Sequence, residues 1–213
     1  MGQYFQPIVL ENNSNTPKYH WYSHDFHNGL KLMEHSYIGN TFMGAIEKFI
    51  TDNPCRLVWA GDYADVLPNH NDTLFDMSDN GYGERITPTI LNKTRKKSID
   101  SLFKYLQNYS KNKNRYIINH IKKQYVDKTK LPIEKKYGFT INPLSLLTCQ
   151  SNGRGGGDYC GSNEKLVGSW CGDFISVSEN IPDVSYTELI PNFMEQGCKY
   201  TMPKPVMAKV KTM

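Results

Sequence analysis

The sequence lacks the patterns that mark exported, membrane-spanning and zinc-binding proteins. No stretch approaches the length of a membrane span, and residues 1–6 have neither the basic nor the apolar region of a signal peptide. The cysteines form an odd set without a C-x-x-C pair, namely Cys55, Cys149, Cys160, Cys171 and Cys198. These absences argue against a membrane partner, a disulfide framework and a cysteine zinc site. They predict a cytoplasmic protein with reduced thiols.

The chain also has little net charge. Its 25 basic and 21 acidic residues leave a formal charge of +4, which is small for a protein that binds a phosphate backbone, so nucleic acid is not the expected partner. Hydrophobic residues make up 38% of the chain and aromatic residues 12%, which is enough for a packed core. We expect a single α+β domain over residues 1–202 and an extended tail over 203–213. Homo-oligomerisation is left open.

The hydrophobic pattern predicts a mainly antiparallel sheet with about two helices packed on it. Apolar residues recur at helical spacing after Asn40 and again after Ser98, and both of these residues suit a helix N-cap. Residues 65–97 are polar and predict a long surface loop with a basic lead-in. Residues 30–35 fit either a strand or a short helix. Strands are expected at 3–10, 19–23, 55–60, 115–120, 124–127, 139–141, 144–149 and 174–177.

Two short segments resemble each other. Trp59-Ala60-Gly61-Asp62 and Trp170-Cys171-Gly172-Asp173 each combine a tryptophan, a small residue, a glycine and an aspartate. We call them the Trp59 turn and the Trp170 turn. In a structural interpretation each Trp packs in the core, each Gly adopts a special backbone angle and each Asp accepts local amide hydrogen bonds. In a functional interpretation the four Trp and Asp side chains border a ligand site.

A glycine-rich segment follows residue 151 and is the most unusual part of the chain. Free backbone amides in such a segment can bind an anion, and an arginine can hold a phosphate through two hydrogen bonds. The segment matches neither G-x-G-x-x-G nor G-x-x-x-x-G-K-[ST], so a surface loop without a ligand is the alternative. The candidate ligand-binding residues here are Asn152, Gly153, Arg154, Gly155, Gly156, Gly157 and Asp158.

Candidates for metal binding and catalysis are weaker. His24, His27 and His35 lie close in sequence, but they form no H-E-x-x-H motif, and we predict no metal site. His70 and His120 stand isolated. A convergence of Asp62, Asp158 and Asp173 would supply carboxylates for a metal or a proton relay. No catalytic residue and no cofactor is assigned, and whether the protein is an enzyme is left open.

Several segments together resemble a family of uncharacterised bacteriophage and gut-bacterial proteins. The resemblance covers most of the chain except residues 66–114, and it implies a phage or mobile-element origin and a host-cytoplasmic setting. Where that family tends to have Ala after the second Trp, this chain has Cys171, which weakens a catalytic role for that position. The segments are residues 1–4, 29–36 (GLKLMEHS), 58–65 (VWAGDYAD), 152–159 (NGRGGGDY) and 168–173.

These observations lead to one preferred function and two alternatives. The preferred function is an accessory protein that binds a small ligand, a nucleotide or another anionic metabolite. In it Trp59 and Trp170 stack on a base, Arg154 and the glycine amides hold phosphate, and the aspartates accept hydroxyl or amine donors. One alternative is a metal-dependent enzyme that acts on a nucleotide-like substrate. The other is a protein-interaction or virion-associated module with no small ligand.

Overall fold

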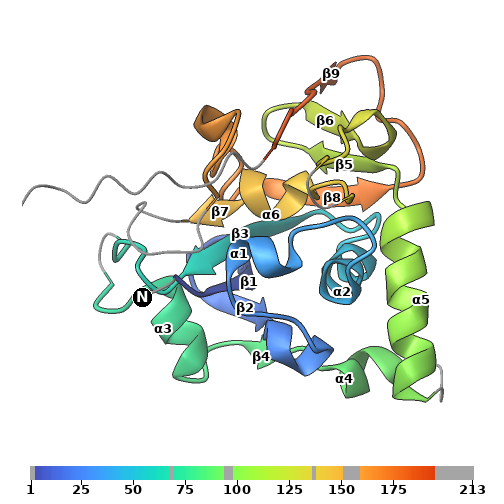
Figure 1. Cartoon of the computed structure of the whole chain (residues 1–213). Coiled ribbons are helices and arrows are strands. Elements are labelled where there is room, and N and C mark those ends of the chain that lie inside the picture. The colour runs from blue at the N-terminus through green and yellow to red at the C-terminus, as the bar shows by residue number, and fades with distance from the viewer. Residues whose placement is uncertain (1–2, 68–69, 94–97, 136–137, 151–158, 195–213) are drawn as a thin grey trace, which may run out of the picture.

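The computed structural model describes residues 3–67, 70–93, 98–135, 138–150 and 159–194. These residues form one sheet of nine strands, in the order β4-β2-β1-β3-β8-β5-β6-β9, with β7 paired to β3 (Figure 1). Five of the eight strand pairings are antiparallel, which confirms the predicted α+β fold with a mainly antiparallel sheet. The strands are β1 (Phe5–Leu10), β2 (Pro17–His20), β3 (Cys55–Gly61), β4 (Glu84–Arg85), β5 (Tyr116–Asn119), β6 (Gln124–Asp127), β7 (Cys149–Gln150), β8 (Phe174–Ser178) and β9 (Thr187–Glu188).

Two helices are longer than two turns, and both were predicted. The Asn40 side chain caps α2 by accepting hydrogen bonds from two backbone amides, and the Ser98 side chain caps α5 in the same way through one amide. The α-helices are α1 (Leu32–His35), α2 (Thr41–Phe49), α3 (Leu74–Asp79), α4 (Pro88–Asn92), α5 (Ile99–Asn112) and α6 (Pro143–Leu147). Three 3-10 helices complete the described part, namely η1 (Ser23–Phe26), η2 (Lys128–Lys130) and η3 (Glu164–Leu166).

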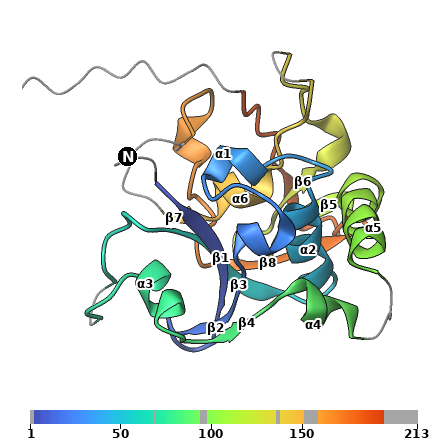
Figure 2. The same ribbon diagram turned by 60° about the horizontal axis from the view of Figure 1, so that its bottom comes forward.

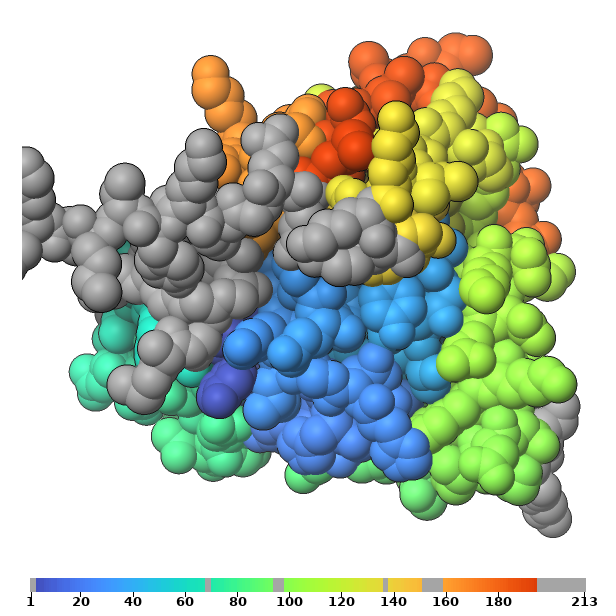
Figure 3. Space-filling view, viewed as in Figure 1, coloured from blue at the N-terminus to red at the C-terminus, as the bar shows by residue number. Residues whose placement is uncertain are grey.

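Helices lie on both faces of the sheet and bury separate apolar clusters (Figure 2). The larger cluster includes Trp59 of β3 and side chains from α2, α5 and α6. The smaller cluster lies between α3 and the opposite face of β1 and β3, and it includes Ile8, Val58 and Ala60. Neighbouring residues of a strand point to opposite faces, so β3 serves both clusters. In the space-filling view the first fifty residues form the middle of one side of the molecule, and α5 borders them (Figure 3).

Three predictions about local structure are wrong. Residues 139–141, predicted as a strand, form only isolated bridges, from Phe139 to Glu134 and from Ile141 to Tyr37. The stretch 65–97, predicted as a loop, contains α3, β4 and α4, because Thr73 and Thr87 cap short helices within it. The stretch 144–149, predicted as a strand, is mostly α6. There Asn142 accepts a hydrogen bond from the Leu144 amide, and Pro143 occupies the first helical position. Residues 30–35, left open between strand and helix, contain α1.

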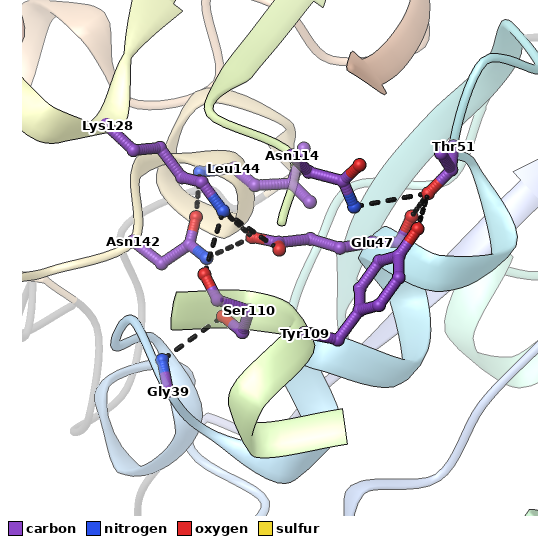
Figure 4. A network of polar contacts seen from close by, with 9 residues as sticks. All are labelled: Gly39, Glu47, Thr51, Tyr109, Ser110, Asn114, Lys128, Asn142 and Leu144. Atoms are coloured by element: carbon purple, nitrogen blue, oxygen red, sulfur yellow. Dashed lines mark hydrogen bonds and ion pairs between the residues drawn. The ribbon is translucent and has the colours of Figure 1, made fainter. Parts of the chain in front are cut away.

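A buried ion pair joins α2 to η2, the 3-10 helix that follows β6 (Figure 4). Lys128 Nζ donates to both carboxylate oxygens of Glu47, at 3.0 and 2.9 Å, and to the carbonyl oxygen of Ser110 at 3.0 Å. Asn142 Nδ2 donates to the same carboxylate at 2.7 Å. Burial raises the pKa of Glu47, and the Lys128 charge opposes that rise. Both side chains are buried from solvent, and their charged atoms are hydrogen-bonded to each other and to neighbouring groups. We therefore assign the pair the structural role of fixing α2 against α5 and η2.

No helix among the described residues is both long and apolar enough to cross a bilayer.

Candidate functional site

The two tryptophans predicted to stack on a ligand are fully buried. Trp59 and Trp170 both have 0% of their surface exposed. Trp59 Nε1 donates to His35 Nε2 at 3.0 Å, and Trp170 Nε1 donates to Gln124 Oε1 at 3.1 Å. The stacking role is therefore wrong for both residues, because neither ring has a face that a ligand can reach. The structural interpretation of the two Trp side chains is confirmed.

The glycines of the two turns are needed for different reasons. Gly172 has a φ of +76°, a left-handed conformation that favours glycine. Gly61 instead belongs to β3, and a Cβ built on it would lie 2.3 Å from Gln3 Nε2. The predicted special backbone angle is thus confirmed for Gly172 and wrong for Gly61. At Gly61 a glycine is needed because the neighbouring Gln3 side chain leaves no room for a Cβ.

The two aspartates lie near opposite ends of β3. Asp62 follows the strand, and its Oδ1 accepts a hydrogen bond from the Tyr4 amide at 3.0 Å. Asp173 lies beside the strand start, where its carbonyl oxygen accepts from the Leu57 amide at 3.2 Å. The strand rises about 3.3 Å per residue, so roughly 17 Å of backbone separates the two positions. The structure therefore keeps the two aspartates apart, although the Trp59 and Trp170 amides donate to the adjacent carbonyl oxygens of Thr148 and Leu147 at 2.9 and 2.7 Å.

The glycine-rich residues Asn152, Gly153, Arg154, Gly155, Gly156, Gly157 and Asp158 lie outside the described residues, so their role stays a prediction. The described chain reaches Gln150 just before them. Gln150 ends β7, which runs parallel to β3 with Gln150 opposite Ala60. Ala60 is two residues before Asp62. Gln150 is thus in register with a residue of the Trp59 turn, while Leu147, three residues earlier, accepts a hydrogen bond from the Trp170 amide at 2.7 Å.

Three residues form one row across the sheet at this point. Gln6 of β1 and Gln150 of β7 are both in register with Ala60 of β3, which lies between them. Residues in register share a face of the sheet, so both glutamine side chains project from the face that carries Ala60 and α3. We call Gln6, Ala60 and Gln150 the glutamine row.

The glutamine row holds buried hydrogen-bond acceptors that are not used. Gln6 Oε1 and Gln150 Oε1 are shielded from solvent, and neither has a hydrogen-bond partner within the described residues. The Ser169 hydroxyl, next to the Gly168 backbone that packs against the Cys149 carbonyl, is a third such group. An unpaired buried polar group costs about 1–3 kcal/mol, and most buried groups in proteins are paired. Because Gln6 and Gln150 flank Ala60 on one face of the sheet, we take their two oxygens to mark a candidate ligand site.

One end of Gln6 is tightly held. Its Nε2 donates to Ser78 Oγ at 2.6 Å, to the Phe75 carbonyl oxygen at 3.1 Å and to Asp79 Oδ1 at 3.5 Å. All three acceptors belong to α3. Turning the amide over would place its oxygen against the Phe75 carbonyl oxygen and the Asp79 carboxylate, neither of which can donate a hydrogen bond, so Oε1 remains the free end.

The row lies close to the surface. Tyr4 and Asp62 face each other two residues beyond Gln6 and Ala60, just outside β1 and β3, since the Asp62 amide donates to the Tyr4 carbonyl oxygen at 3.0 Å. Tyr4 is 43% exposed. Partial burial raises the pKa of the Asp62 carboxyl, and the Tyr4 amide opposes that rise. Two residues of strand span about 7 Å, so the exposed Tyr4 lies about that far along the backbone from the row.

The histidines of the sequence have structural partners. His35 is 0% exposed, and burial lowers its pKa to about 4. His24 lies 3.7 Å from an Asp25 carboxylate oxygen, and the His27 ring packs edge-on against Phe103. In the described part of the chain, no three His, Cys, Asp or Glu side chains gather in a way that could hold a metal ion.

His120 was predicted to be isolated, and that prediction is wrong. Its Nε2 lies 2.8 Å from Ser176 Oγ and its Nδ1 lies 3.1 Å from the Tyr186 hydroxyl, an arrangement that resembles a nucleophile and its base. Ser176 is only 3% exposed, however, and sits within β8. We therefore interpret the contact as one that pairs a buried hydroxyl. The partners are far apart in sequence, which explains why the pattern was not visible there.

Cys55 and Cys171 are not activated nucleophiles. Cys55, Cys149 and Cys171 are free, and burial raises the pKa of Cys55 to about 12 and that of Cys171 to about 11. Thiols with such pKa values stay protonated near neutral pH. Cys160 is disulfide-bonded, so the prediction of reduced thiols is wrong for this residue. An odd count without a C-x-x-C pair does not exclude a bond between cysteines distant in sequence.

Sequence reasoning missed both glutamines of the row. The available signal for Gln6 was a polar amide inside an otherwise apolar strand, where all six residues of β1 are buried. Gln150 had no such signal, because only its pairing with β3 gives it a place in the site.

The chain matches no protein-family model, no curated protein and no solved structure, so the assignment of a site rests on the geometry above.

Proposed function

We propose that this protein binds a small polar ligand of the nucleotide type, as an accessory protein of phage or mobile-element origin. The observation that carries the proposal is the pair of buried, unpaired amide oxygens of Gln6 and Gln150 on either side of Ala60. A ligand that places N–H or O–H groups against these oxygens would satisfy them. A role in ligand binding would then explain why the protein keeps two unpaired buried oxygens, which lower the stability of the ligand-free protein.

The contacts differ from those first predicted for Trp59 and Trp170. The donor groups of the ligand would meet the glutamine row, and the Asp62 carboxylate beside Tyr4 would accept a further hydroxyl or amine. The expectation that Arg154 and its neighbouring glycines hold a phosphate is compatible with this placement. It fits because Gln150 directly precedes that segment and lies beside the strand that leads to Asp62.

Native mass spectrometry of the protein purified from cells, followed by denaturation, tests the proposal. We expect a bound small molecule in the wild-type protein, and we expect Gln150→Leu to lose it, because the substitution removes one acceptor. Gln107→Leu is the matched control, since Gln107 is exposed on α5. The control should keep the wild-type occupancy.

Two results would overturn the proposal. One is an empty wild-type protein whose melting temperature also does not respond to any common nucleotide. The other is a bound molecule whose occupancy is the same in the wild type and in Gln150→Leu.

A further inference from the structure

The chemistry of the glutamine row limits what kind of ligand it can accept. A carbonyl oxygen of an amide accepts hydrogen bonds and cannot donate them. Gln6 and Gln150 both leave this oxygen unpaired, and the carboxylate of Asp62 is also an acceptor. An acceptor-rich site favours ligand groups that donate, such as amino groups, and disfavours carbonyl groups at the same place.

The orientation of Gln6 makes this preference rigid. A free glutamine side chain could turn its amide by half a rotation and present N–H instead of C=O. Here Ser78, Asp79 and the Phe75 carbonyl occupy the N–H side. The site therefore cannot adapt to a ligand that offers an acceptor without breaking these hydrogen bonds.

Asp79 is itself held in place. The Tyr22 hydroxyl donates to Asp79 Oδ1, and Arg85 stacks on the Tyr22 ring, with its guanidinium carbon 4.4 Å from the ring centre. Arg85 in turn donates to both carboxylate oxygens of Asp25, at 3.0 and 2.6 Å. Burial and the Asp79 contact raise the pKa of Tyr22 to about 12, so the hydroxyl remains a donor at neutral pH. The chain of contacts keeps an acceptor facing Gln6 Nε2.

We infer that the site selects nucleotides whose base carries an amino group over those with a carbonyl at the same ring position. Ser78 and Asp79 are the positioning residues that enforce this choice through Gln6. This inference rests on the proposed function, and it names the ligand class that the same site takes.

Isothermal titration with two matched pairs of nucleotides tests the inference. The pairs are adenosine against inosine 5′-monophosphate and cytidine against uridine 5′-monophosphate, which exchange an amino group for a carbonyl. We expect the wild-type protein to bind the amino member of at least one pair about tenfold or more tightly, the effect of one hydrogen bond to a buried acceptor.

The variant Ser78→Ala tests whether Ser78 sets the ligand preference by positioning Gln6 or only contributes to folding. Removing this hydroxyl takes away the shortest of the three hydrogen bonds that hold Gln6 Nε2, at 2.6 Å, so the amide is held less firmly. The preference for the amino member should then fall at least about threefold, mainly through tighter binding of the carbonyl member. A loss of stability alone would weaken both members equally. Ser101→Ala, at an exposed position of α5, is the control and should keep the wild-type ratio.

The outcomes distinguish the inference from the proposed function. Equal affinities within both pairs would overturn the inference and leave ligand binding intact. Binding of none of the four nucleotides would overturn both. If Ser78→Ala does not fold, the affinity ratios of the wild-type protein alone decide between these results.

Discussion

The Trp59 turn and the Trp170 turn share a sequence pattern and differ in nearly everything else. Trp59 and Gly61 are part of a strand, and the turn ends beside the glutamine row. The Trp170 turn lies outside the strands, and its Gly172 amide donates to the Leu57 carbonyl oxygen at 2.9 Å. One turn borders the candidate site, and the other fastens the start of β3. A shared four-residue pattern is therefore poor evidence for a shared role.

The partners of the two indole N–H groups also differ in their access to water. His35, which accepts from Trp59, is 0% exposed, whereas Gln124, which accepts from Trp170, is half-buried. Because Trp59 donates to Nε2 of His35, the ring carries its proton on Nδ1, which donates to the Gly29 carbonyl oxygen at 3.0 Å. The contact between Trp59 and His35 is thus fully buried, so we expect a substitution of Trp59 to destabilise the fold more than one of Trp170.

The largest expected effect comes from replacing each tryptophan. Trp59→Phe leaves His35 with an unpaired buried nitrogen and a cavity, so it should lower the free energy of unfolding by roughly 3–4 kcal/mol. Trp170→Phe should cost about 1–2 kcal/mol less, because water can reach Gln124. Urea denaturation of both variants measures the difference. Equal losses would remove the distinction between the two turns.

The next effect is a loss of stability in acid that depends on His35. Burial lowers its pKa from 6.5 in the unfolded chain to about 4 in the folded protein. The folded state therefore binds fewer protons between these values, and stability present above pH 6.5 is lost as the pH falls toward 4. The loss should be about 3 kcal/mol.

Urea denaturation between pH 7 and pH 4 measures this dependence on His35. In His35→Gln the pH dependence should shrink by that amount, while His70→Gln at a partly exposed site should leave it unchanged. An identical pH dependence in His35→Gln and the wild type would show that His35 titrates normally.

The two glycines should respond differently to larger side chains. Gly61→Ala forces a Cβ against buried Gln3 and should cost about 2 kcal/mol. In Gly172→Ala the new Cβ would make only ordinary contacts, 3.9 Å from Arg56 Nη2, but it would stand at positive φ, at a cost of about 1 kcal/mol. Gly172→Asn should be milder, since Asn tolerates this conformation, whereas Gly61→Asn should be worse than Gly61→Ala. Thermal unfolding tests this order, and its reversal would contradict the account.

The smallest effect concerns Asp173. It accepts from Asn119 Nδ2 at 2.8 Å and lies 3.3 Å from Lys122 Nζ, but the Lys122 side chain is 42% exposed. Asp173→Asn should therefore cost less than about 1 kcal/mol, and part of the loss should disappear at high salt. Nucleotide binding should not change, whereas Asp62→Asn should weaken it. Titration of both variants tests the contrast, and weaker binding in Asp173→Asn would place the site at the wrong end of β3.

The parts of the fold that were predictable depend on local signals. The helices α2 and α5 combine helical spacing of apolar residues with a capping side chain, and both were found from the sequence. The stretch 144–149 is equally apolar along its length and short, so its pattern could not distinguish a strand from a helix. Asn142 as an N-cap and Pro143 at the first helical position are the signals that would have indicated a helix.

The candidate site was only partly predictable, because it depends on contacts between distant residues. Asp62 and the glycine-rich segment were singled out by unusual composition. The row itself joins residues 6, 60 and 150 through strand pairing, which no local pattern encodes. Trp59 was placed correctly in the core, but its partner His35 was not identified, since the two lie 24 residues apart.

The stability of Gln150→Met in the ligand-free protein tests the central claim most directly. Met has nearly the shape of Gln and removes the buried, unpaired oxygen, so the account predicts a free energy of unfolding about 1 kcal/mol or more above that of the wild type. A decrease of similar size would show that the Gln150 oxygen is already paired in the folded protein. In that case the row would be part of the scaffold and not a place for a ligand.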